Sequence, residues 1–364
     1  MSKDMPVTVG SVLSTQDISA WFIKNPILPS LAETVFPLIK SEQTTWKTIS
    51  NSSNILNEAA DPMSLNSPIP VSTRGGFSEV IGEMTTFGKG YEWTADQIEK
   101  YERLKRNLSQ FKNASAAAEL LDYYGADLAR VRTAMDAQMA YMDWSIVSNA
   151  CNYSFLQTNS PYMQGITAMD YGVATWQKDA VSASWALDTT KILDDIQYYL
   201  ELGEDKGKEY TYIYLNKKSL GWVRANTQIK NQAITLVGSL VGADVNPNLE
   251  AINTMMESYF DLPVKFVMIN EKVSRESLTG VKTTSNPFQD GVAIFAQESK
   301  LGHFEWNQIP IIDPTKETLE NFYVVGNYTR IDPSYAKIYG KGRAFPVIDT
   351  FADNMYVKID ATSW

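Results

Sequence analysis

One stretch in the middle of the chain restricts the possible folds more than any other feature. Between residues 115 and 149, apolar side chains recur at a mean spacing of about 3.6 residues, and no proline interrupts them. This pattern predicts one continuous amphipathic helix, roughly 50 Å long at about 1.5 Å per residue, several times the usual helix length. The methionines of the stripe are in register with ordinary core residues, which favours a packing seam over a cofactor groove. The stripe consists of Leu121, Tyr124, Leu128, Val131, Met135, Met139, Met142 and Ile146.

The chain before this helix divides into two parts, neither of which has enough apolar residues for a core of its own. Residues 1–66 contain one short amphipathic segment at 18–23 and are otherwise rich in Pro, Ser and Asn, which predicts an extended arm. Residues 68–93 are rich in glycine and in strand-forming residues, which predicts a long β-hairpin. The pattern T-x-x-Q at residues 94–97 is a capping box and predicts the start of a helix. The apolar side chains of the arm need a surface from the rest of the chain or from a neighbouring copy.

The chain after the long helix alternates between helical and extended patterns. A stripe over residues 192–203 predicts a helix, and Asn246 followed by Pro247 predicts the cap and first turn of another. The polar loop between residues 270 and 291 is predicted to be mobile. Strands are predicted at residues 211–216, 264–270, 291–297, 321–327, 344–349 and 354–360.

Composition excludes several classes of protein. The 364 residues are 44% hydrophobic, which is enough for two or three folded domains. The formal net charge is −10, so the chain lacks the cationic field that sequence-specific DNA or RNA binding requires. The N-terminus does not have the pattern of a secretory signal, and the longest apolar run is about half the length that crosses a bilayer. We therefore expect no export and no membrane span.

The residues that usually carry catalysis or bind metals are scarce. The chain has one histidine, His303, and one cysteine, Cys151, so a structural zinc site lacks ligands and an intramolecular disulfide is excluded. A single cysteine fits a reducing compartment. No G-x-S-x-G motif is present, and residues 82–90 fail as a phosphate loop because the glycine spacing is wrong and Gly90 follows Lys89. We predict no catalytic residue, no cofactor-binding residue and no metal site.

Several segments carry a resemblance to a known family. They are the run PVSTRGGF at residues 70–77, TADQI at 94–98 with the long helix after it, and, in the tail, Gly302, the Asp332-Pro333 pair and FPV at 345–347. In this order they resemble the major capsid proteins of tailed bacteriophages, especially the group that includes the lambda-type coat protein. The resemblance covers most of the chain.

The resemblance implies the α+β fold of Hong Kong 97-like phage capsid proteins. Its parts would be an N-terminal arm (1–66), an extended E-loop hairpin (67–93), a P-domain with the spine helix (94–159), an A-domain (160–320), and P-domain strands with the C-terminus (321–364). This order agrees with the arm, hairpin and long helix expected from the residues themselves.

The function that the resemblance implies is structural and not enzymatic. Copies of the chain would form hexamers and pentamers, close an icosahedral head shell in the host cytoplasm and enclose double-stranded DNA in the virion, with only non-specific proximity to that DNA. Scaffold, portal and decoration proteins would be separate partners. Two alternatives stay open: a nanocompartment shell protein of the encapsulin type that encloses protein cargo, and a soluble α/β enzyme.

Candidate contacts between subunits follow from exposure and from the tendency of aromatic and arginine side chains to anchor interfaces. In the hairpin we expect Arg74, Phe77, Lys89 and Trp93 to contact a neighbouring copy. In the arm we expect the same of Trp21, Phe22 and Trp46.

Overall fold

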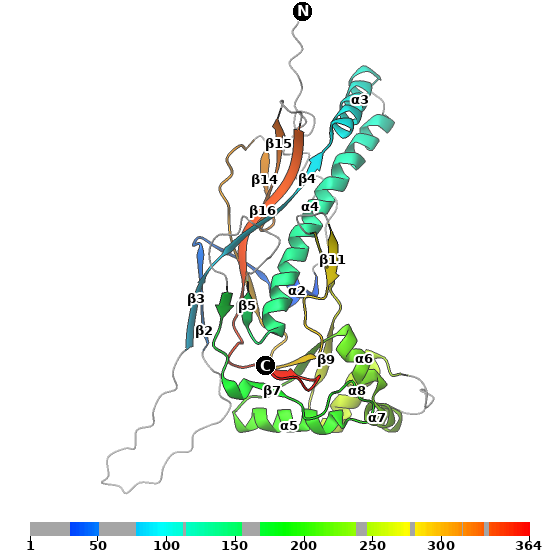
Figure 1. Cartoon of the computed structure of the whole chain (residues 1–364), viewed down its shortest axis with the longest axis vertical. Helices are drawn as coiled ribbons and strands as arrows, with labels where there is room; N and C mark the ends of the chain where they lie inside the picture. The colour runs from blue at the N-terminus through cyan, green and yellow to red at the C-terminus, as the bar shows by residue number, and fades with distance from the viewer. Residues whose placement is uncertain are drawn as a thin grey trace, which may run out of the picture.

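The computed structural model describes residues 30–50, 78–111, 114–154, 168–237, 246–276, 281–314, 316–330 and 335–364. In the described residues, the two largest β-sheets have six and five strands, and two hydrophobic cores are present. The first core includes residues of both sheets, and the second lies between the five-stranded sheet and its helices. A long helix lies along the larger sheet, and a group of shorter helices lies beside the smaller sheet at one end of the molecule (Figure 1).

The long helix is the one that the sequence predicts. Helix α4 (Ala114–Ser148) has 35 residues and follows α3 (Ala95–Phe111). The start of α3 agrees with the predicted capping box, since the Thr94 N–H donates to Gln97 Oε1 at 2.9 Å. The described part of the predicted stripe is buried, which confirms it as a packing seam; its members are Leu128, Val131, Met135, Met139, Met142 and Ile146.

The larger sheet has six strands arranged around one long strand. They are β1 (Leu38–Ser41), β13 (Gly302–Asn307), β16 (Tyr335–Ile348), β15 (Tyr323–Arg330), β14 (Glu317–Glu320) and β4 (Thr85–Trp93). Along one edge, β16 pairs first with β15 and then with β13; along the other it pairs with β4. Helix α4 packs closely on β16 because position 340 is a glycine. A Cβ there would lie 2.7 Å from Val131 Cγ1.

The smaller sheet has five strands in the order β7 (Lys178–Ala180), β17 (Met355–Lys358), β12 (Val292–Ala296), β8 (Tyr212–Asn216) and β9 (Lys265–Ile269). Its helices are α5 (Ile192–Asp205), α6 (Lys217–Ala225), α7 (Thr227–Val237) and α8 (Leu249–Phe260). Helix α8 is capped by Asn248, whose side chain accepts from Ala251 N, and not by Asn246 as predicted. The remaining short elements are α2 (Leu31–Val35), β5 (Asn152–Ser154), β6 (Ala168–Asp170) and the 3-10 turn η2 (Thr175–Gln177).

The expected hairpin is paired differently from the prediction. Strand β3 (Ser78–Glu83) does not pair with β4; it pairs antiparallel with β2 (Thr45–Ser50), which belongs to the expected arm. Strand β4 instead joins the larger sheet through β16. The two strands β2 and β3, here called the ribbon, therefore flank residues 51–77. The apolar residues Phe36 and Trp46 of the expected arm find their surface in the core of the same chain.

The sheets combine strands from distant parts of the chain, and the expected domain limits stay a prediction. Strands β13 and β14, expected in the A-domain, belong to the six-stranded sheet, and β17, expected in the P-domain, belongs to the five-stranded sheet. The described part of the loop predicted to be mobile contains another antiparallel pair, β10 (Val273–Glu276) with β11 (Lys282–Ser285). Among the described residues, no helix is long and apolar enough to cross a membrane.

Candidate assembly surfaces

One face of the ribbon exposes two isoleucines among charged and polar residues. In its register Lys47 lies opposite Ile81, and Ile49 lies opposite Glu79. Side chains at these positions share one face because neighbouring residues of a strand alternate between faces. Ile49 and Ile81 are 53% and 59% exposed, and Lys47 pairs with Glu79 at 2.6 Å. The two isoleucines therefore lie beside an ion pair on the outer face of the ribbon.

The opposite face of the ribbon is fixed to the chain by Trp46. Its ring is 1% exposed and is stacked against Tyr171 and Phe345, with ring centroids 5.5 and 5.2 Å away. Gly82 of β3 lies against the same indole, where a Cβ would come within 2.6 Å of the ring. Trp46 therefore orients the ribbon, and its ring has almost no surface left for a neighbouring copy.

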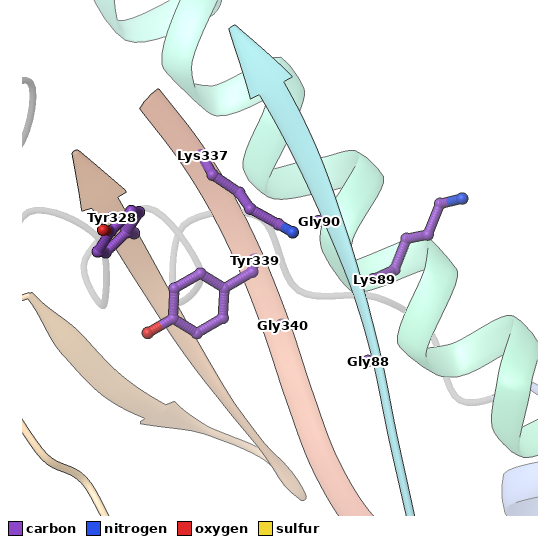
Figure 2. A pocket seen from close by; sticks show the side chains of 7 residues that line it. All are labelled: Gly88, Lys89, Gly90, Tyr328, Lys337, Tyr339 and Gly340. Carbon is purple, nitrogen blue, oxygen red and sulfur yellow. The ribbon is translucent and has the colours of Figure 1, made fainter. Parts of the chain in front are cut away.

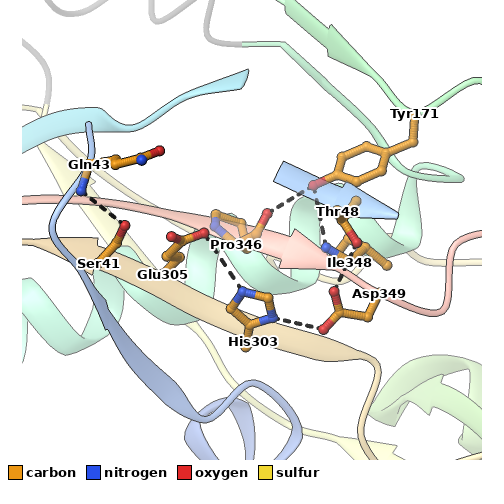
Figure 3. A network of polar contacts seen from close by, with 9 residues as sticks. All are labelled: Ser41, Gln43, Thr48, Tyr171, His303, Glu305, Pro346, Ile348 and Asp349. Atoms are coloured by element: carbon orange, nitrogen blue, oxygen red, sulfur yellow. Dashed lines mark hydrogen bonds and ion pairs between the residues drawn. The ribbon is translucent and has the colours of Figure 1, made fainter. Parts of the chain in front are cut away.

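A chain of polar contacts joins the ribbon to the larger sheet (Figure 3). Thr48 Oγ1 donates to Asp349 Oδ1 at 2.9 Å, and Asp349 Oδ2 lies 2.7 Å from His303 Nδ1. Glu305 Oε2 lies 3.8 Å from His303 Nε2. Burial lowers the pKa of His303, but the hydrogen bond and charge of Asp349 and the charge of Glu305 outweigh it, so the pKa is raised above 6.5. His303 thus lies between two carboxylates.

An open groove lies on the larger sheet where β4, β15 and β16 meet (Figure 2). It measures about 390 Å³, its floor includes Gly88, Gly90 and Gly340, and its other lining residues include Tyr328, Lys337 and Tyr339. Lys89 also lines the groove, at its rim. Its side chain points away from Tyr339 (Figure 2) and pairs with Glu276 of β10 at 3.3 Å. Residues 82–90, compared above with a phosphate loop, lie on β3 and β4 and on the link between them.

One acidic residue of α4 is buried in the core. Asp143 is fully buried, and neither of its side-chain oxygens has a hydrogen-bond partner in the described part of the chain. Burial, and then the charge of Glu271, raise its pKa well above the usual value. Glu271 itself accepts from Trp144 Nε1 at 2.5 Å and from Ala32 N at 3.3 Å. It thereby links α2 to α4.

The single cysteine is also enclosed. Cys151 Sγ lies 2.8 Å from Tyr356 Oη, and burial raises the pKa of its thiol to about 12. The group is therefore a neutral thiol at physiological pH. The described residues contain no group of three or more His, Cys, Asp or Glu side chains placed to hold a metal ion.

The predicted contact residues fall into three groups in the structure. Trp46 and Trp93 are buried in the core of their own chain, where Trp93 Nε1 donates to Asp127 Oδ2 at 2.8 Å. Lys89 is partly exposed and paired with Glu276. The other four, Trp21, Phe22, Arg74 and Phe77, lie outside the described residues. Sequence reasoning missed Ile49 and Ile81, because only the pairing of β2 with β3 places them on one face.

Sequence comparison finds no protein-family model and no curated protein that matches the chain. Solved structures do match it. A proposed prophage capsid protein from E. coli CFT073 is 13% identical, with a TM-score of 0.57 over 95% of this chain and 99% of the other. A phage-related protein from Bordetella bronchiseptica RB50 is 11% identical, with a TM-score of 0.53 over 97% of this chain and 99% of the other. The chain therefore has a phage-capsid fold, which confirms the fold class expected from its sequence.

Proposed function

We propose that the chain is a major capsid protein, a structural subunit of an icosahedral phage head. The observation that carries the proposal is the shared fold, which extends over nearly the whole of this chain and of the proposed prophage capsid protein. The alignment covers 95% of this chain and 99% of the other, so it does not rest on one common motif.

The distribution of apolar residues supports assembly. The ribbon is a two-stranded element with an exposed face that includes Ile49 and Ile81. A two-stranded element is marginal by itself, and burial against a second copy would stabilise it. Closed rings need heterologous interfaces, in which one surface of a subunit meets a different surface of the next. We infer that the outer face of the ribbon is one such surface in hexamers and pentamers.

The expected contact residues divide into those proposed to touch a neighbouring copy and those that position the contact surface. Trp21, Phe22, Arg74 and Phe77 remain proposed contacts to a neighbouring copy, and Lys89 is a fifth, on the groove rim. Trp46 and Trp93 would act indirectly, because they hold the ribbon and β4 in place.

The proposal includes the packaged content and the other partners. A chain with a net charge of −10 would face double-stranded DNA without binding it tightly. Scaffold, portal and decoration proteins would be separate chains, the shell would form in the host cytoplasm, and the subunit would catalyse no reaction. A nanocompartment shell would instead contain protein, so analysis of the nucleic acid and protein inside purified particles separates the two functions.

An assembly variant tests the proposed surface. Ile81→Asp places a carboxylate on the outer face of the ribbon, where burial against a neighbour would cost several kcal/mol, about 3 or more. We expect the subunit to stay folded and to lose most of its assembly, measured as the fraction that sediments as large particles. Ile312→Asp is the matched control, since Ile312 is 83% exposed on the connection between β13 and β14. Equal assembly of Ile81→Asp and wild type, or equal loss in both variants, would exclude the ribbon as the specific contact.

A further inference from the structure

The only histidine of the chain lies where the ribbon meets the larger sheet. His303 is on β13, its two ring nitrogens face Asp349 and Glu305, and its side chain is 18% exposed. Asp349 follows β16 directly and is also the acceptor for Thr48 of the ribbon. One carboxylate therefore contacts both the titratable imidazole and the ribbon.

The ribbon has other contacts besides the one between Thr48 and Asp349. Trp46 stacks on aromatic rings, and the pair between Lys47 and Glu79 lies on the outer face. Tyr171, which stacks on Trp46, donates to the Pro346 carbonyl at 3.1 Å and has its pKa raised well above 10 by burial. Within the described residues, the charged groups that act on His303 are Asp349 and Glu305.

We propose that His303 is a pH-sensitive latch that holds the ribbon to the end of the larger sheet when the imidazole is protonated and loosens it when the imidazole is neutral. The protonated ring donates from both nitrogens and compensates the charges of Asp349 and Glu305. The neutral ring donates from one nitrogen only, so two carboxylates face each other with less compensation. Residues 51–77 connect the two strands of the ribbon in sequence. The inference concerns a single chain and does not depend on the proposed shell.

The sign of the effect follows from the direction of the pKa shift. The pKa of His303 is raised above 6.5 in the folded chain, because Asp349 and Glu305 favour the charged ring more than burial disfavours it. Its contribution to stability is therefore complete below the unfolded-state pKa and is lost as the pH rises through the folded-state pKa. The ribbon should be held most firmly on the acidic side of neutrality.

Amide hydrogen exchange in β2 and β3 tests the latch. Wild type and His303→Gln are compared at the same pH, so the intrinsic pH dependence of exchange cancels. At about pH 6, ribbon amides of wild type should exchange roughly tenfold more slowly than those of His303→Gln, and at about pH 9 the two should agree. Asp349→Asn should likewise exchange its ribbon amides at the same rate as His303→Gln at both pH values. Glu79→Gln breaks the ion pair on the outer face of the ribbon, and this variant should keep the slower exchange at about pH 6 that wild type shows.

A ratio between wild type and His303→Gln that is the same at both pH values would overturn the proposal. A direct measurement covers the case in which His303→Gln does not fold. Because the chain has one histidine, its imidazole gives a single titrating nuclear magnetic resonance signal. That signal should report a pKa above 6.5 in wild type and a lower pKa in Asp349→Asn. A pKa at or below 6.5 in wild type would also overturn the proposal.

Discussion

Replacing Trp46 by alanine should lower the free energy of unfolding by about 3–5 kcal/mol, one of the two largest effects that the structure predicts. The side chain is a fully buried indole between Tyr171 and Phe345, and Gly82 lies against its edge. Its removal would leave a cavity where the ribbon meets the larger sheet. The measurement is chemical denaturation of the isolated subunit, with the slope of the transition checked for two-state behaviour.

Two further substitutions make the Trp46 prediction specific. Trp46 Nε1 is buried without a hydrogen-bond partner among the described residues, so Trp46→Phe keeps the stacking and loses no hydrogen bond that the structure shows. We expect it to cost less than about 1.5 kcal/mol. Trp364→Ala, at an exposed indole that donates to the Asp179 carbonyl, should cost about 1 kcal/mol. If Trp46→Ala were no more damaging than Trp364→Ala, Trp46 would not anchor the ribbon.

Replacing Asp143 by asparagine should make the chain more stable than wild type, and the difference should grow as the pH rises. Burial and the charge of Glu271 raise the pKa of Asp143 in the folded state. Between the unfolded-state pKa and the folded-state pKa, the folded chain keeps a proton that the unfolded chain has released. Wild type therefore loses up to about 1.4 kcal/mol per pH unit in this interval. The asparagine side chain does not titrate, so the free energy of unfolding of the variant does not fall in this way.

The Asp143 prediction is checked by unfolding wild type and variant between about pH 5 and pH 8. Asp290→Asn is a control of the opposite kind. Although burial raises the pKa of Asp290, its contacts with Lys218 and Asn216 lower it overall, so the carboxylate is already ionised in both states across this range. The difference between Asp290→Asn and wild type should therefore stay constant with pH. A constant difference for Asp143→Asn would show that Asp143 is ionised in the folded chain.

The parts of the fold that could be predicted from sequence are those determined by local patterns. Helix α4 was predicted within about one residue at each end because its apolar spacing is a property of consecutive residues. The capping box at Thr94 and the strands β8, β9 and β12 are local in the same sense. Residues close together in sequence determine these features, so they can be predicted from one sequence without a structure.

The pairing of strands could not be predicted in this way. The hairpin prediction joined β3 to β4 because they are adjacent in sequence, whereas β3 pairs with β2 across residues 51–77 and β4 pairs with β16. The strand β17 likewise joins a different sheet from β16, although a short connection separates them. Strand propensity shows that a segment is extended but does not identify its partner.

The candidate surfaces depend on the same non-local information. Ile49 and Ile81 share a face only because of the register of the ribbon. The partner of His303, Asp349, is 46 residues away in sequence, and Thr48 is 301 residues from Asp349. The aromatic residues Trp46 and Trp93 were chosen as interface anchors by residue type, and the structure shows that both are occupied within their own chain.

The measurement that most directly tests the central proposal is negative-stain electron microscopy combined with sedimentation of the purified chain. The chain would be expressed alone and then together with the products of neighbouring genes. A capsid subunit should form rings of five or six copies, or closed shells of uniform size, in at least one of the two conditions. A compact monomer in both conditions would contradict the capsid function and leave only the phage-capsid fold.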